Sequence, residues 1–173
     1  MANANTIAVA PGLPSAAMGA SSTAEFQFTD TASTPVRLMV KVGQPQLKNK
    51  LFKVKAGGRV TGGTTTNFTV KLDSGTSATI GSNTTIEASS ARAVDSESAN
   101  WFIEAVCFCD ETSDKLGGFG RSMVNDLYDA EAALDAEAAA DPDGELGFTV
   151  TGTFSASHAS NAAYCDFFDV EVL

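Results

Sequence analysis

The feature that most restricts the fold of this chain is a two-residue alternation of apolar and polar side chains. It recurs in VRLMVKV (36–42), LFKVKA (51–56), NFTVKL (67–72), GFTVTGTF (147–154) and FFDVEV (167–172). Because successive side chains of a β-strand point to opposite faces, this period predicts strands with one face on a core and the other in water.

The segment NWFIEAVCFCDE (100–111) departs from this pattern, because both of its faces are apolar except at Glu104. Trp101 begins one face and Phe102 begins the other. Such a strand lies at the centre of a sheet or in a subunit interface. With about eight short strands separated by turn residues, the chain is predicted to be an all-β sandwich or barrel in one domain, residues 25–173.

Two segments differ in composition from the predicted strands. Residues 1–24 are small, polar and punctuated by proline, which predicts an extended N-terminal arm that docks on a neighbour, with a disordered tail as the alternative. MVNDLYDAEAALDAEAAADPDGE (123–145) holds eight acidic residues and no basic one. Its strong helix formers predict a short acidic helix, and the alternative is a loop inserted between strands.

Charge is distributed unevenly along the chain. Residues 37–71 hold eight Lys or Arg and no acid, whereas residues 73–173 hold 19 acids and three basic residues. The two groups could meet inside one subunit, face each other across neighbouring subunits, or belong to a mixed and solvated surface. The net charge of −10 argues against a nucleic-acid partner, since binding a phosphate backbone requires clustered positive charge.

The cysteines and the N-terminus indicate the compartment in which the chain folds. Cys107, Cys109 and Cys165 are an odd number without the spacing of a disulfide framework, which suits a reducing cytoplasm. No Lys or Arg precedes Arg37, so the charged start of a secretory signal is absent, and no apolar run has the length of a membrane span. We therefore expect a soluble protein, made in the cytoplasm and not associated with a membrane.

The only histidine, His158, lies among serines in SASHASNAA (155–163) and invites comparison with a Ser–His–Asp triad. A triad needs a serine on a strained elbow and a carboxylate that orients the histidine, and the chain has no G-x-S-x-G motif. Small hydroxyl and amide residues between two strong strands predict instead the connection of a terminal hairpin. We therefore predict no enzymatic activity and no catalytic residue.

No metal or cofactor site is predicted. Cys107 and Cys109 share one strand face, but zinc needs two further ligands, and buried thiols more often pack as small apolar groups. ADPDGE (140–145) lacks the spacing of an EF-hand loop, so solvated acids are expected there, with a weak divalent-ion site as the alternative. GGRVTGG (57–63) lacks the Lys and the helix of a phosphate-binding loop and is predicted to form a hairpin turn.

Three blocks of the chain together resemble the jelly-roll domains of tailed-phage virion proteins. They are LFKVKAGGRVTGGTTTNFTVKL (51–72), ANWFIEAVCFCDETSDKLGG (99–118) and GFTVTGTFSASHASNAAYCDFFDVEV (147–172). The resemblance implies a jelly-roll-like β-sandwich, commonly a trimer, without enzymatic activity or cofactors. It also implies a place in the virion, either as a capsid decoration or cement protein bound to the major capsid protein, or as a tail or fibre module that binds a receptor such as a carbohydrate.

Aromatic side chains are predicted to form the subunit or capsid interface of such a protein. Their number exceeds what one small sandwich core needs, so copies of the chain would cover the remainder. The predicted interface residues are Phe26, Phe28, Trp101, Phe102, Phe108, Phe167 and Phe168. We therefore expect a homotrimeric decoration protein that bridges neighbouring capsomers, and a single Trp makes a sugar-binding module the weaker alternative.

Overall fold

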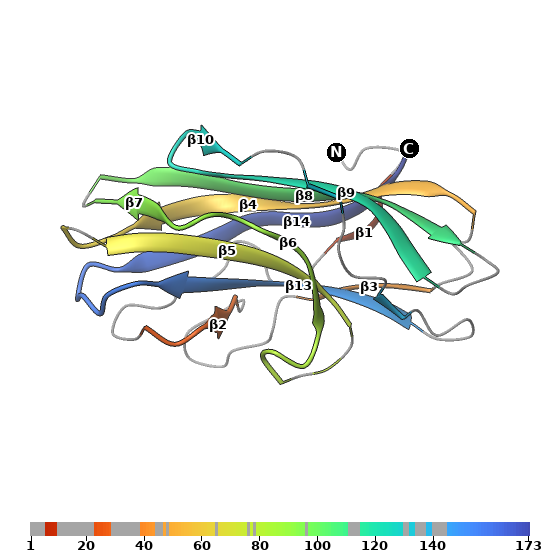
Figure 1. Ribbon diagram of the computed structural model, residues 1–173, viewed down its shortest axis with the longest axis horizontal. Coiled ribbons are helices and arrows are strands. Elements are labelled where there is room, and N and C mark those ends of the chain that lie inside the picture. Colours follow the sequence, from red (N-terminus) through yellow and green to blue (C-terminus); the bar gives the residue numbers. More distant parts are fainter. Residues whose placement is uncertain are drawn as a thin grey trace.

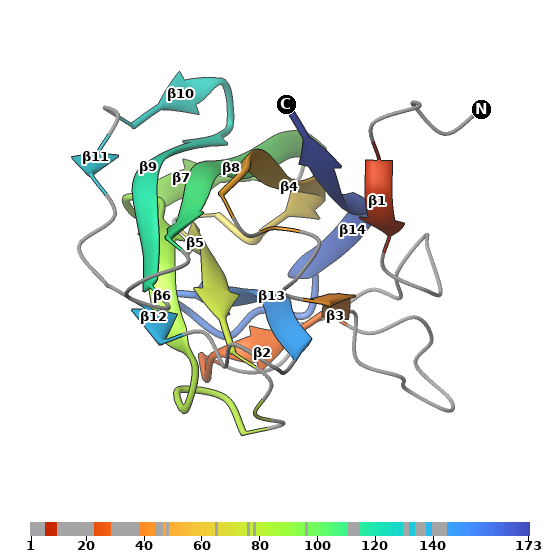
Figure 2. The same ribbon diagram turned by 90° about the vertical axis from the view of Figure 1, so that its right-hand side faces the viewer.

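Two antiparallel β-sheets pack face to face, as the computed structural model shows in Figure 1 and, from its end, in Figure 2. The predicted all-β sandwich is confirmed, and the described residues contain no helix. The structure describes residues 6–9, 23–28, 39–43, 47, 49–64, 66–75, 77, 79–95, 97–110, 115–129, 132–133, 138–139 and 145–173.

The large sheet has eight strands in the order β1-β14-β4-β8-β9-β10, and β11 and β12 also pair with β9. Its strands are β1 (Thr6–Val9), β4 (Leu51–Thr61), β8 (Ala99–Asp110), β9 (Lys115–Val124), β10 (Leu127–Tyr128), β11 (Ala132–Ala133), β12 (Ala138–Ala139) and β14 (Ala162–Val172). The small sheet has six strands in the order β2-β13-β5-β6, with β3 paired to β13 and β7 paired to β5. Its strands are β2 (Phe26–Gln27), β3 (Met39–Gly43), β5 (Thr66–Ser74), β6 (Thr84–Ala88), β7 (Arg92–Val94) and β13 (Glu145–Phe154).

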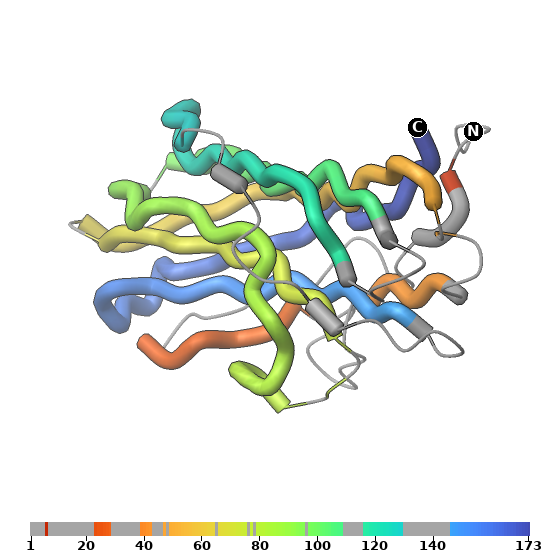
Figure 3. Tube along the Cα trace, turned by 45° about the vertical axis from the view of Figure 1, so that its right-hand side comes forward, coloured from red at the N-terminus to blue at the C-terminus, as the bar shows by residue number. Residues whose placement is uncertain are grey.

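The strands change sheets in the order of a jelly roll. In the large sheet β14 lies between β1 and β4, and β4 pairs with β8; in the small sheet β13 lies between β3 and β5. Consecutive strands β3 and β4, β4 and β5, and β13 and β14 therefore lie in opposite sheets, as the trace in Figure 3 shows. This is the double Greek-key arrangement of a jelly-roll-like sandwich, and β9 to β12 extend its large sheet.

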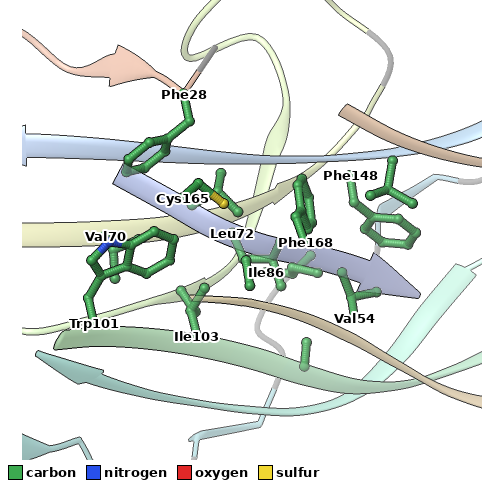
Figure 4. Packing of buried hydrophobic residues seen from close by; sticks show 14 of the residues in the cluster. Phe28, Val54, Val70, Leu72, Ile86, Trp101, Ile103, Phe148, Cys165 and Phe168 are labelled. Atoms are coloured by element: carbon green, nitrogen blue, oxygen red, sulfur yellow. The ribbon is translucent and has the colours of Figure 1, made fainter. Parts of the chain in front are cut away.

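The core lies between the two sheets and consists of the inward-facing residue of each alternating pair. In β4 the inward residues Phe52, Val54 and Ala56 have no exposed surface. Trp101 of β8 points towards Phe28 of the facing layer, with 5.1 Å between the ring centroids (Figure 4). Since each Å² of buried apolar surface stabilises the fold by roughly 25 cal/mol, these large rings dominate the stability of the sandwich.

The two segments predicted as hairpin turns connect the sheets instead. β4 runs through Gly57 and Gly58 without interruption and ends at Thr61, and the next strand, β5, belongs to the other sheet. SASHASNAA (155–163) likewise joins β13 of the small sheet to β14 of the large sheet. Both hairpin predictions are wrong because turn-forming residues indicate where a chain reverses, and not which sheet its next strand joins.

The helix predicted within residues 123–145 is wrong for the part of this segment that the structure describes. Three short strands stand there instead, β10, β11 and β12, and all three pair antiparallel with β9. Figure 2 shows them along the edge of the large sheet. Pairing with a neighbouring strand overrides helix propensity, which is a weak preference for each residue.

Part of the predicted N-terminal arm is a strand of the large sheet. β1 pairs antiparallel with β14, and its register places Thr6 opposite Glu171 and Val9 opposite Asp169. Residues 1–5 and 10–22 of the arm lie outside the described residues. The docking of the arm on a neighbour therefore stays a prediction, while β1 itself lies at the edge of its own subunit's sheet.

A cluster of polar side chains lies where β6 of the small sheet meets β9 of the large one. Ser122 donates a hydrogen bond to Glu87 over 3.0 Å, and Asp129 accepts from the Ser90 amide over 2.8 Å and from Arg92 over 2.6 Å. Burial raises the pKa of Glu87; Ser122 opposes this rise and Asp129 adds to it. Burial also acts to raise the pKa of Asp129, but hydrogen bonds from Ser90 and Arg92 outweigh it and lower that pKa.

Replacement of Glu87 by Gln is expected to stabilise the fold at neutral pH. Because the pKa of Glu87 is raised, the folded state binds its proton more tightly than the unfolded state, so its ionisation reduces stability as the pH rises. The gain from Glu87→Gln should be present at pH 7 and vanish near pH 4, as measured by urea unfolding. Asp129→Asn is the opposite control: it should destabilise at pH 7, with a loss that shrinks on acidification, and equal signs for the two variants would contradict this account.

Candidate interaction surface

The outer face of the large sheet, turned away from the core, is the candidate functional site. Paired residues of antiparallel strands project to the same side, so β14, β4, β8 and β9 present rows of side chains across this face. The rows are Phe167–Gly57–Phe102–Met123, then Asp169–Lys55–Glu104–Arg121, then Glu171–Lys53–Val106–Phe119, and finally Leu51–Phe108–Gly117 at one end. Charged residues thus occupy the middle of the face, and apolar residues occupy both ends.

The charged band in the middle consists of Lys53, Lys55, Glu104, Arg121, Asp169 and Glu171. The ammonium nitrogen of Lys55 lies 2.9 Å from Glu171 and 3.8 Å from Asp169. That of Lys53 lies 3.6 Å from Glu104. The hydrogen bond to Glu171 raises the pKa of Lys55, whereas burial raises the pKa of Asp169. Arg121 also pairs with Glu104, so the band holds three basic and three acidic groups across four strands.

Within these pairs, the basic and acidic parts of the chain meet inside one subunit. Lys53 and Lys55 come from the basic part, and their partners come from the acidic part. Arg59 adds a bidentate pair with Asp166, in which Nε and Nη2 of the guanidinium group each donate to one carboxylate oxygen over 2.8 Å. Planar guanidinium and carboxylate groups favour this geometry. Of the three arrangements considered from the sequence, these residues adopt the first.

An end patch of apolar side chains lies on one side of the charged band. It consists of Leu51, Val106, Phe108, Phe119 and Leu173, and Leu173 is held beside Leu51 by a 3.0 Å backbone hydrogen bond. The exposed fractions are 53% for Leu51, 40% for Phe108, 45% for Phe119 and 59% for Leu173. A group of large apolar side chains on one face of a sheet is typical of a surface that contacts a partner.

An aromatic hollow lies on the other side of the charged band. Its volume is about 530 Å³, and its lining includes Asn100, Phe102, Arg121, Tyr128, Asp166 and Phe167. The rings of Phe102 and Phe167 are 6.3 Å apart between centroids. The Phe167 ring lies over Gly57, where a Cβ atom would stand only 2.6 Å from it. Gly57 therefore allows this ring to lie close to the sheet.

Three of the seven aromatic residues predicted at an interface belong to the core of the subunit. Phe28 and Phe168 have no exposed surface, and Trp101 is 1% exposed. The interface prediction is corrected for these three, because the facing sheet already covers them. The indole nitrogen of Trp101 also has a partner inside the subunit, the carbonyl of Tyr164 at 2.9 Å.

The other four aromatic residues keep some exposure. Phe108 and Phe167 are 40% and 39% exposed, and Phe102 is partly buried. Phe102 and Phe167 line the hollow, whereas Phe108 belongs to the end patch on the opposite side of the charged band. Phe26 is partly buried at β2 and packs against the core, far from both groups in the strand order.

Sequence reasoning missed Leu51, Phe119 and Tyr128, which are among the most exposed large apolar residues. For Leu51, a pair of adjacent apolar residues in the sequence signals an exposed apolar side chain. Successive strand residues face opposite sides, so a pair such as Leu51–Phe52 must leave one member outside the core. Leu51 is 53% exposed and Phe52 is fully buried. Phe119 stands between glycines in GGFG and has no such signal.

His158 lies exposed in the connection from β13 to β14, as a loop residue. Its Nδ1 atom is 2.5 Å from the hydroxyl of Ser160 and accepts from the Ser160 amide over 3.2 Å. The Asn161 amide donates to the carbonyl of His158 over 3.0 Å. No carboxylate of the described residues forms an ion pair with the imidazole, so the serine and the histidine form a local turn motif and not a triad.

Two cysteines lie in the described core. Cys107 and Cys165 are buried and form no disulfide. Burial raises the pKa of Cys165 to about 12, which keeps it a thiol, whereas metal ligation requires the thiolate. In the part of the chain that the structure describes, no group of three or more His, Cys, Asp or Glu could hold a metal ion. The side chain of Cys109 and residues 140–144 of the calcium candidate lie outside that part.

Comparison with known protein families, with curated proteins and with solved structures finds no match to this chain. Among the described residues, no helix has the length and apolar character needed to cross a membrane.

Proposed function

We propose that this protein is a non-enzymatic structural protein of a tailed-phage virion. It acts as a homotrimeric capsid decoration or cement protein, is made in the host cytoplasm, and bridges neighbouring capsomers by binding the major capsid protein. The observation that carries this proposal is the end patch, where Leu51, Phe108, Phe119 and Leu173 are each at least 40% exposed on one sheet face.

Two further observations support an assembly role. The patch borders the charged band, in which each of the six charged groups has an ion-pair partner within the subunit. β1 lies at the margin of the same sheet, next to β14, and leaves its outer edge open among the described strands. An open strand edge is a site at which a second chain can add backbone hydrogen bonds.

The oligomer is tested by size-exclusion chromatography with light scattering at micromolar concentration. The unmodified chain should elute as a trimer, and Phe108→Glu and Phe119→Glu should shift it to a monomer, because each buries a charge in an apolar contact. Ile80→Glu is the matched control, since Ile80 is similarly exposed at 39% but lies in the turn before β6.

The capsid role is tested by adding the purified chain to capsids that lack it and measuring the bound copies by gel densitometry. We expect saturable binding that resists mild heating of the shell and is lost with Phe119→Glu but kept with Ile80→Glu. A monomer that binds no capsid protein, with or without these substitutions, would overturn the proposal.

A further inference from the structure

The aromatic hollow has the size and the lining of a ligand site. Its volume of about 530 Å³ lies within the range of roughly 300–1,000 Å³ typical of small-molecule sites. Phe102, Tyr128 and Phe167 give it apolar surfaces, and Asn100 and Asp166 give it polar groups. In such sites, a small number of polar groups among the aromatic surfaces orients the bound molecule.

Its aromatic surfaces are open to solvent. Tyr128 is 65% exposed and Phe167 is 39% exposed, so water contacts much of these rings. Phe102 and Phe167 are tilted by 39° with their centroids 6.3 Å apart, which forms a shallow apolar seat. A ligand with an apolar face of its own would displace water from this seat.

The charges around the hollow are already compensated. Arg121 donates to Glu104, and Asp166 is held by Arg59 through two 2.8 Å hydrogen bonds. An anion would have to compete with Glu104 or Asp166 for a guanidinium group that is already paired, and a cation would have to compete with Arg121 or Arg59 for a carboxylate. The lining therefore favours a neutral ligand over an anion or a cation.

Two polar side chains on the rim of the hollow are available to bind a ligand. Among the described residues, neither the carboxamide of Asn100 nor the hydroxyl of Tyr128 has a hydrogen-bond partner. The carboxamide supplies donors and an acceptor, and the phenol supplies one of each. A ligand that carries several hydroxyl groups would satisfy both.

We infer that the aromatic hollow binds a neutral saccharide. A sugar ring combines an apolar face of C–H groups, suited to Phe167 and Tyr128, with hydroxyl groups suited to Asn100. A peptide would place one apolar side chain in this seat, whereas a saccharide ring presents hydroxyl groups around its whole edge to both rim groups. The inference goes beyond an assembly role and does not rest on it, because the charged band separates the hollow from the end patch.

The test is titration of the full-length ¹⁵N-labelled chain, followed by NMR, with maltose, cellobiose, lactose and N,N′-diacetylchitobiose, together with a neutral-glycan array. At least one saccharide should shift the amides of Asn100, Phe102, Tyr128 and Phe167 saturably. Phe167→Ala and Tyr128→Ala should weaken the affinity at least about tenfold. Phe119→Ala, which removes a similarly exposed ring from the end patch, should leave it unchanged.

The conservative variant Tyr128→Phe keeps the ring and removes only the hydroxyl, so it reports on the rim if an alanine variant is unfolded. It should weaken the affinity less than Tyr128→Ala does.

The inference is overturned if no neutral glycan binds, or if Phe119→Ala weakens binding as much as Phe167→Ala. It is also overturned if N-acetyl-phenylalanine amide shifts the same amides and the saccharides do not, which would assign the hollow to a peptide. Loss of trimers with Phe108→Glu while saccharide binding persists would separate this site from the assembly surface.

Discussion

Replacing Trp101 by Ala is expected to lower the free energy of unfolding by about 3–5 kcal/mol. The indole is 1% exposed, and its ring stacks on Phe28 with 5.1 Å between centroids. Its N–H also donates to the carbonyl of Tyr164, so the variant leaves both a cavity and an unsatisfied acceptor. Together these effects make it one of the most damaging single truncations of the core.

Urea unfolding followed by circular dichroism measures this loss, and Phe108→Ala on the same strand is the control. Because Phe108 is 40% exposed, its truncation should cost less than about 1 kcal/mol to the isolated subunit. Protein concentration separates the two roles. The loss for Trp101→Ala should not change with concentration, whereas that for Phe108→Ala should grow if the end patch holds subunits together. If the two variants lost equal stability and both losses depended on protein concentration, Trp101 would belong to a subunit interface.

The strands and the inward faces could be predicted from the sequence, because the period of two is a local property. Val40 and Val42 are buried and Lys41 is exposed, as the alternation in VRLMVKV predicts. Where two apolar residues adjoin, the pattern no longer distinguishes core from surface. Phe167 is 39% exposed and Phe168 is fully buried, yet both were assigned to an interface.

The connections between strands could not be predicted from local chemistry. A glycine pair such as Gly62–Gly63 suits a hairpin and also suits a crossing from one sheet to the other. What distinguishes the two is distant in sequence: Gly63 donates its amide to the side chain of Asn161 over 3.1 Å, and Gly62 donates to the carbonyl of Asp95 over 2.7 Å. Both interactions exist only once the sandwich has formed.

The aromatic hollow is built from residues that the sequence indicated and from one that only the strand pairing brings there. Phe102 and Phe167 were singled out as aromatic residues without a place in a small core, and the structure brings them together. Tyr128 joins them because β10 folds back on β9, in a segment whose composition predicts a helix. Local propensity could not indicate that pairing, since the hydrogen bonds that decide it come from another strand.

Gly58→Ala is expected to lower the free energy of unfolding by about 2–4 kcal/mol, because the added methyl group has no space. A Cβ atom at Gly58 would stand 1.9 Å from the carbonyl oxygen of Tyr164, and a backbone atom cannot rotate away as a side chain can. The register of β14 shifts at this point, between Cys165 and Phe167.

The same substitution should also distort the hollow, because the displaced backbone leads directly into Asp166 and Phe167. Thermal unfolding and saccharide titration of the same sample therefore should both change for Gly58→Ala. Gly117→Ala is the matched control on β9: nothing lies within 4 Å of its Cβ position, so it should be neutral or stabilise by up to about 1 kcal/mol. If Gly58→Ala were as stable as Gly117→Ala, β14 could not approach β4 as closely as described. The position of the Phe167 ring would then differ from the position on which the saccharide inference is based.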